Sequence, residues 1–361
     1  MPLKSQKPKL AVYWASSCGG CEIALVNLNE KFLELDDVFD FFFCPCLLDT
    51  KKKDVEALDN GSIAVTLFNG AIRTTENEEM ARLLRRKSRL LIAFGSCAAE
   101  GCIPALANLH SHGEHMRDIY LDNPSIDNPL GTLPQAESLV RTGEITPSDA
   151  SETRTRGKPS PPVKLTLPTW LERVKTLSQT VRVDYSIPGC PPEPHRIWEA
   201  VERLTDGTPP PPRGSVLGAG ASTVCAECDR RKGEKKIPRF YRPHEFYGPV
   251  EPDSIAGPSA EKCLLEQGLL CMGIATREGC GALCPRVNAP CTGCYGPPEG
   301  VSDQGARMVA AVGTIIDTGD IKNLSVEEIL RRTDAALDAI PDPAGTFYRY
   351  SLAGSILKAR I

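Results

Sequence analysis

The stretch LAVYWASSCGGCE, residues 10–22, places two thiols directly after an apolar run that is typical of a buried strand. The same arrangement occurs twice more. Cys97 follows the apolar run LLIAF, and Cys190 follows VDYSI. The carboxyl ends of parallel strands open onto one edge of a sheet. We therefore expect the thiols of three strand ends to converge at that edge: Cys18, Cys21, Cys97 and Cys190.

Strand and helix patterns alternate over the first two hundred residues. The predicted strands cover 10–16, 39–48, 61–70, 89–96 and 182–189. The predicted helices cover 21–35, 76–87 and 193–204. This alternation predicts an α/β fold with a doubly wound, mostly parallel sheet.

The remainder of the chain has a different character. Residues 120–167 are predicted to form an exposed loop, and residues 205–220 a stiff proline linker. Residues 221–300 have almost no periodicity but hold eight of the fifteen cysteines, so an inorganic centre should organise them. Helices are predicted at 302–317 and 325–340. The expected division is 1–204 for the α/β domain, 205–300 for an irregular cysteine-rich domain and 301–361 for a helical tail.

Composition limits the classes of function. The 46 acidic and 42 basic residues give a net charge of −4, which does not favour nucleic acid as a partner. The sequence shows no secretory signal and no apolar run long enough to span a membrane, which predicts a soluble cytoplasmic protein. Thiols stay reduced there, and an odd number of cysteines argues against full disulfide pairing.

Four converging thiolates suit either a [4Fe–4S] cluster or a zinc ion, and spacing alone does not separate the two. The glycines beside the thiols favour the bulkier cluster, because they let the backbone approach it closely. The eight cysteines of the second part divide into two further sets of four. The remaining Cys44, Cys46 and Cys102 are expected to be small buried side chains.

In this order, the motifs CGGCE, GSCAA and PGCPP, followed by CLLEQGLLCMGIATREGC and PCTGC, resemble the small subunit of [NiFe] hydrogenases. The resemblance covers nearly the whole chain. It implies a flavodoxin-like domain followed by an irregular iron–sulfur cluster-binding domain with three clusters. The implied proximal ligands are Cys18, Cys21, Cys97 and Cys190. The implied distal ligands are Cys225, Cys228, Cys263 and Cys271. The implied medial ligands are Cys280, Cys284, Cys291 and Cys294.

Two departures from the periplasmic enzymes of that family point to its cytoplasmic branch. Cys225 stands where those enzymes use a histidine, and Cys284 supplies a fourth medial ligand that many of them lack. The segments FNGAIRTTENEEMARLLR and GSCAAEGCIPALANLH look most like the methyl-viologen-reducing subgroup associated with heterodisulfide reductase. Cys102 stands where glycine is expected, and residues 142–164 look like an insertion.

The resemblance implies an electron-transfer subunit with three [4Fe–4S] clusters and no catalytic residue of its own. The Ni–Fe centre would lie on a large partner subunit, and a further iron–sulfur or flavin subunit of the heterodisulfide reductase type would accept the electrons. Glu22 is expected to be an acid in the first turn of a helix, with a role in proton movement as the alternative. The rival functions are a stand-alone iron–sulfur electron carrier and a structural zinc protein.

Overall fold

The computed structural model describes residues 7–133, 168–234, 236–242, 244–245, 259–317 and 324–357. The strands are β1 (Lys9–Trp14), β2 (Asp40–Phe43), β3 (Ile63–Asn69), β4 (Ile72–Thr74), β5 (Ser88–Phe94), β6 (Trp170–Lys175) and β7 (Tyr185–Ile187). The α-helices are α1 (Gly20–Val26), α2 (Glu30–Val38), α3 (Lys52–Glu56), α4 (Thr75–Lys87), α5 (Ser96–Glu100), α6 (His112–Arg117), α7 (Pro194–Thr205), α8 (Val224–Glu227), α10 (Leu283–Arg286), α11 (Gln304–Ile315), α12 (Val326–Leu337) and α13 (Pro343–Phe347). The predicted insertion at 142–164 lies outside the described residues.

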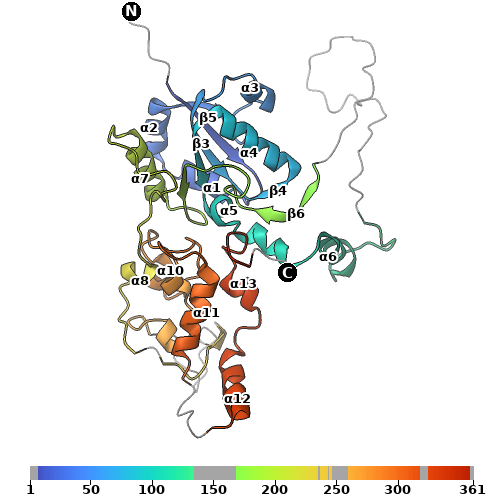
Figure 1. Cartoon of the computed structure of the whole chain (residues 1–361), viewed down its shortest axis with the longest axis vertical. Helices are drawn as coiled ribbons and strands as arrows, with labels where there is room; N and C mark the ends of the chain where they lie inside the picture. The colour runs from blue at the N-terminus through green and yellow to red at the C-terminus, as the bar shows by residue number, and fades with distance from the viewer. Residues whose placement is uncertain are drawn as a thin grey trace, which may run out of the picture.

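Five strands form one sheet in the order β2-β1-β3-β5-β7, and every neighbouring pair is parallel. This order is that of flavodoxin-like folds, so the predicted α/β class is confirmed. Figure 1 shows this sheet in the upper half of the molecule, with helices on both of its sides. The sheet's carboxyl-terminal edge faces the cysteine-rich half below it.

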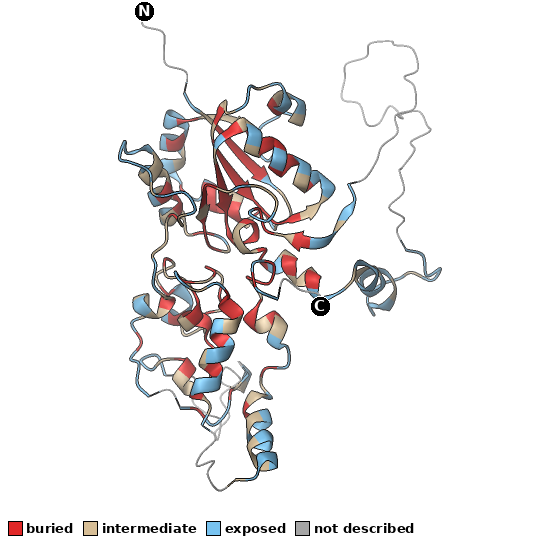
Figure 2. Cartoon of the chain, in the orientation of Figure 1, coloured by how far each residue is buried: buried red, intermediate tan, exposed pale blue. Residues whose placement is uncertain are grey.

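The two faces of the sheet are buried in two separate cores. Along β1, Leu10 and Val12 join the core that α1, α2 and α7 cover. The alternate residues Ala11 and Tyr13 join the core that α4 covers. Because successive side chains of a strand point to opposite faces, a continuous apolar run is what a sheet buried on both faces requires. Figure 2 shows this burial along the central strands.

Two local predictions were wrong, and one strand pair was missed. The helix predicted over 21–35 is divided into α1 and α2, because the chain turns at Asn29, whose φ of 55° and ψ of −122° are not helical. The strand predicted over 39–48 ends at Phe43, before a turn that contains Pro45. The antiparallel pair of β4 and β6 was not predicted, since it joins segments almost a hundred residues apart.

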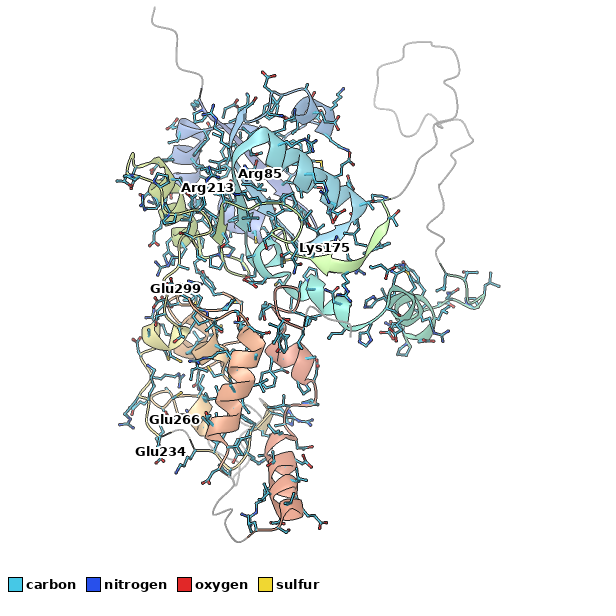
Figure 3. The ribbon with its side chains drawn as sticks, viewed as in Figure 1. Arg85, Lys175, Arg213, Glu234, Glu266 and Glu299 are labelled. Carbon is cyan, nitrogen blue, oxygen red and sulfur yellow. The ribbon has the colours of Figure 1, made fainter. Side chains whose placement is uncertain are left out.

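A buried carboxylate fixes one end of this domain. Asp184 is fully buried and forms ion pairs with Arg85, at 2.6 Å, and with Arg213. It also accepts a hydrogen bond of 2.8 Å from the Leu91 backbone N–H. Figure 3 labels both arginines, which come from α4 and from the proline-rich linker. The linker is thereby attached to the sheet, and loss of either cation would leave a buried charge less well paired.

The second half is built around a third core, which draws on both the cysteine-rich segment and the last helices. Leu264 and Met272 of the former pack in one cluster with Met308 and Val312 of α11 and Phe347 of α13. None of the helices described between 221 and 300 is longer than four residues. This agrees with the lack of periodicity there. Among the described residues, no helix is long and apolar enough to cross a membrane.

Candidate functional site

The carboxyl-terminal edge of the sheet brings together Cys18, Cys21, Cys97 and Cys190, which we call the edge group. Burial is the first cause of a raised pKa at the Cys21 thiol. The nearby charges of Cys97, Glu22, Cys190 and Cys18 raise that pKa further, which shows that the four thiols are neighbours. Cys21 and Cys97 are buried, Cys190 is partly buried and Cys18 is exposed.

Backbone hydrogen bonds between the ends of β5 and β7 position two of these thiols. The Ser96 N–H donates to the Gly189 carbonyl at 2.8 Å, and the Gly189 N–H donates to the Ser96 hydroxyl at 3.1 Å. The Gly95 N–H donates to the Ile187 carbonyl at 2.8 Å. These hydrogen bonds hold the carboxyl ends of β5 and β7 next to each other immediately before Cys97 and Cys190.

Gly95 lies at the base of the edge group. Its φ of +80° and ψ of 164° belong to a region that only glycine populates readily. A Cβ at this position would lie 2.3 Å from the Cys21 sulfur. The absence of a side chain at residue 95 therefore leaves a space beside the edge group that any other residue would fill.

A fifth thiol contacts the edge group. Cys102 is fully buried, and its sulfur lies 3.7 Å from the Cys190 sulfur. This contact raises the pKa of Cys102 and lowers that of Cys190, as expected when Cys102 donates and Cys190 accepts. Cys102 has a positive φ of 49°, which agrees with the expectation of glycine there. Its predicted burial is confirmed.

Glu22 lies in the first turn of α1, as predicted, and is held there by Asn69. The Asn69 side-chain amide donates to both Glu22 carboxylate oxygens, at 2.8 and 2.7 Å, and to the Ser17 hydroxyl at 2.9 Å. Burial raises the pKa of Glu22, and the Asn69 hydrogen bond opposes that shift. The side-chain Oδ1 of Asn69 is buried and has no hydrogen-bond partner among the described residues. Asn69 was not foreseen; its only signal was its place at the end of a predicted strand.

A second set, Cys225, Cys228, Cys263 and Cys271, lines one small depression in the cysteine-rich half. We call it the pocket group. Burial raises the pKa of Cys271 to about 11, although backbone N–H groups of Gly273 and Cys291 donate to its sulfur. Nearby Cys225 and Cys263 raise it as well. Four thiols from three separate segments thus face one small volume.

A third set, Cys280, Cys284, Cys291 and Cys294, forms the loop group. Burial raises the pKa of Cys294 to about 12, and the charges of Cys280, Cys190 and Cys284 add to this shift. Burial likewise raises the pKa of Cys291, followed by the effects of Cys271 and Cys294. Cys284 on α10 is the exposed member.

The three groups touch one another in a fixed order. The Ser96 hydroxyl, next to Cys97, donates to the Cys294 backbone carbonyl, which joins the edge group to the loop group. The Cys291 backbone N–H donates to the Cys271 sulfur at 3.3 Å, which joins the loop group to the pocket group. The loop group therefore lies between the other two.

Two polar side chains that sequence reasoning missed shape the loop group. The Glu227 carboxylate accepts hydrogen bonds from the Gly279 and Gly281 N–H groups, at 2.9 and 3.1 Å, on either side of Cys280. The Gln304 amide donates to the carbonyls of Gly293 and Gly296, at 2.9 and 3.2 Å, on either side of Cys294. Neither residue belongs to a recognisable motif: Glu227 acts on N–H groups more than fifty residues away, and Gln304 acts on the loop that precedes its own helix.

Cys44 and Cys46 belong to none of the three groups. Cys44 is buried, as predicted, but Cys46 is exposed, so the prediction of burial was wrong for Cys46. The reason is the turn after β2, which directs the chain out of the core. Burial raises the pKa of Cys44 to about 11.

The donors of the three groups fit iron–sulfur clusters. Each group offers four thiols, and thiolate is the ligand that such clusters require. The glycine at residue 95 leaves room that a side chain would fill. Burial opposes formation of free thiolates in each group, so a cationic core that neutralises them would be strongly favoured. Among the residues that the structure describes, no three Cys, His, Asp or Glu side chains are arranged to hold a single metal ion.

The family of the chain follows from its relatives. The model of a family described as NADH ubiquinone oxidoreductase, 20 Kd subunit, matches residues 18–204. An F420-non-reducing hydrogenase iron-sulfur subunit of Archaeoglobus profundus is 36% identical over 354 residues, which are 98% of this chain and 98% of that protein. The chain belongs to this hydrogenase small-subunit family. An F420-non-reducing hydrogenase subunit of Methanothermobacter marburgensis is 30% identical over 99% of this chain and 98% of its own length.

Solved structures similar to this hydrogenase subunit are also hydrogenases. A chain of the [NiFeSe]-hydrogenase of Dm. baculatum is 18% identical and aligns with a TM-score of 0.45, covering 81% of this chain and 95% of its own. A chain of an NAD+-reducing [NiFe]-hydrogenase is 26% identical, with a TM-score of 0.44 and coverage of 57% and 94%. The two F420-non-reducing hydrogenase subunits described above confirm the resemblance to hydrogenase small subunits that the cysteine motifs indicated.

Proposed function

We propose that this hydrogenase subunit carries electrons from a large partner subunit, through three [4Fe–4S] clusters, to a further redox subunit. The edge group would hold the proximal cluster, the loop group the medial cluster and the pocket group the distal cluster. The observation that carries the proposal is the order of contacts between the groups. Ser96, next to Cys97, contacts Cys294, and Cys291 contacts Cys271, so a continuous path runs from the sheet edge to the pocket.

When bound, the clusters supply one-electron redox chemistry at potentials that the protein adjusts. The residues of this chain hold the clusters and stabilise negative charge on their sulfurs. The N–H groups of Gly273 and Cys291 point at the Cys271 sulfur, and those of Ala282 and Leu283 at the Cys280 sulfur. Hydrogen bonds of this kind favour the reduced, more negative state.

The sheet edge has the features of a contact surface for the large subunit. Large apolar side chains are exposed around the ends of the first two strands, among them Trp14 at the end of β1, Ile23 on α1 and Leu47 after β2. Exposed apolar patches of this kind mark protein interfaces. We infer that the large subunit covers this edge and that H2 is split there at a Ni–Fe centre, beside the edge group. A contact that buries a cofactor in this way should be large and permanent.

The proposal also covers the cellular compartment of the complex and its electron acceptor. We propose a cytoplasmic hydrogenase of the methyl-viologen-reducing type, whose electron acceptor is an iron–sulfur or flavin subunit associated with heterodisulfide reductase. The names of the relatives, F420-non-reducing hydrogenase subunits, support this proposal. We also keep the division into 1–204, 205–300 and 301–361 as a proposal.

Copurification from the native host separates this function from a stand-alone iron–sulfur carrier. A tag on this chain should bring down a nickel-containing large subunit in equal amount after anaerobic purification, because the exposed apolar edge needs a partner. Protein that purifies alone, with its full content of iron, would favour the carrier.

Replacing Cys284 with Ala should convert the medial cluster into a [3Fe–4S] cluster with a higher potential, because one of four thiolates is lost. The exposed position of Cys284 lets the iron at that corner dissociate without disturbing the core. The measurement is the EPR spectrum of the oxidised, purified complex. Full iron without a [3Fe–4S] signal would show that Cys284 is not a ligand.

A further inference from the structure

An arginine is buried beside the pocket group. Arg230 is only 7% exposed, which is unusual for a charged side chain, and it lines the same depression as the four thiols of that group. It follows Cys228 by two residues. The function proposed above does not use this residue.

All five N–H donors of the Arg230 guanidinium have partners, and every partner is an uncharged oxygen. The Pro285 carbonyl accepts from Nε at 2.9 Å and from Nη2 at 2.7 Å. The carbonyls of Ser259 and Lys262 accept from Nη1 at 2.7 and 3.0 Å. The Asn288 side-chain oxygen accepts from Nη2 at 2.7 Å. The guanidinium is thus fully hydrogen-bonded, but its charge is not neutralised by these contacts.

The partners belong to the backbone segments that carry the thiols. Lys262 precedes Cys263 of the pocket group, and Pro285 follows Cys284 of the loop group. One side chain therefore holds together three segments: its own, which carries Cys228, and these two. Such a planar set of donors cannot be reproduced by a lysine, which has three donors around one point.

No carboxylate among the described residues forms an ion pair with Arg230. Of the acids in this region, Asp229 is 80% exposed and lies 3.4 Å from Arg286, Glu234 pairs with Lys236 at 3.1 Å, and Glu261 is exposed. Glu266 accepts a hydrogen bond of 2.6 Å from the Gly233 N–H. Figure 3 labels Glu234 and Glu266 in this half of the molecule.

A buried charge is stable only when an opposite charge lies near it. The pocket group is the one anionic centre that the described residues offer within this depression, once its thiols are ligands. Four thiolates outweigh the positive charge of a cubane core, so the loaded site is a net anion, and reduction makes it more negative.

We propose that Arg230 is the built-in counter-charge of the pocket group, a positioning residue that raises the reduction potential of the cluster held there. The inference rests on the proposed function, because it needs a cluster at the pocket group. A fixed cation in a poorly hydrated site stabilises the reduced state more than the oxidised state. Electrons are thereby drawn to the end of the path, where the acceptor takes them.

The test is an EPR-monitored redox titration of the anaerobically purified complex, comparing wild type with R230Q, R230K and R286Q. R230Q removes the charge and keeps a side-chain N–H donor near the carbonyl groups. We expect the reduction equilibrium constant of the distal cluster to fall at least tenfold, which is a shift of 59 mV or more for one electron. The proximal and medial potentials should stay unchanged.

Two further variants separate the effect of the positive charge of Arg230 from the effect of its hydrogen bonds to the loops. R230K keeps the cation and loses most of the hydrogen bonds. We therefore expect the reduction equilibrium constant of its distal cluster to stay within threefold of the wild-type value. R286Q is the control for an arginine of the same region that is half exposed and already paired. Where R230Q loses the distal cluster altogether, the proposal is still supported when R230K keeps that cluster at a reduction potential close to that of wild type.

Two results would overturn the inference. One is an unchanged distal potential in R230Q with full iron, which would make Arg230 only a support for the loops. The other is loss of the distal cluster, or an equal shift of its potential, in both R230Q and R230K. Failure of the underlying function is a separate outcome, because wild-type protein would then show no cluster assignable to the pocket group.

Discussion

Replacing Gly95 with Ala should remove the proximal cluster and abolish H2-dependent reduction of dyes by the complex. The added Cβ would lie 2.3 Å from the Cys21 sulfur, a separation at which one of the two must move. The movable one is the thiol, because the Gly95 backbone is fixed by its hydrogen bond to Ile187. Acid-labile sulfide should fall from about twelve to about eight per chain, since one cubane is lost.

The control for this variant is Gly207→Ala. Gly207 also has a positive φ, of +77°, but a Cβ there would meet nothing within 4 Å. The Gly207→Ala variant therefore places an alanine at a positive φ, with the backbone strain that this causes, but its Cβ does not collide with another atom. Normal sulfide content and activity in Gly95→Ala would mean that the edge group does not hold a cluster. An equal loss in both variants would indicate strain alone.

Replacing Cys225 with Ser should stop electron delivery to the acceptor subunit while sparing H/D exchange at the Ni–Fe centre. The exchange reaction needs no electron to leave, whereas H2 oxidation with the natural acceptor needs the whole path. Cys225 lies in the pocket group, at the end of the sequence of contacts that starts at the sheet edge. The measurement is the ratio of the two activities in one purified complex.

Cys46→Ser serves as the matched control, because Cys46 is exposed and belongs to none of the three groups. It should leave both activities unchanged. Equal loss of exchange and electron delivery in Cys225→Ser would show that Cys225 supports folding or that the order of the clusters is wrong.

The sequence predicted the sheet well because its signals are local. An apolar run followed by a thiol marks a strand end wherever it occurs, and three such runs in a parallel sheet converge at one edge. The structure has Cys21 beside Cys97 and Cys190 for this reason. The parts that failed depend on one residue's conformation or on distant pairing, as at Asn29 and in the β4–β6 pair.

The supporting residues of the site were beyond sequence reasoning. Glu227 binds backbone N–H groups more than fifty residues away, and Gln304 binds carbonyls of the irregular loop before its helix; neither contact leaves a pattern in the chain. Arg230 lies inside a basic run, where a solvated surface is the usual expectation, and its burial is visible only in the fold.

The central claim, that three groups of thiols hold three cubane clusters, is tested most directly by counting acid-labile sulfide. Anaerobically purified complex should contain about twelve sulfides per copy of this chain, with about twelve iron atoms beyond those of the large subunit. Stoichiometric zinc with little or no sulfide would contradict the account, because the thiols would then hold single ions and could not pass electrons.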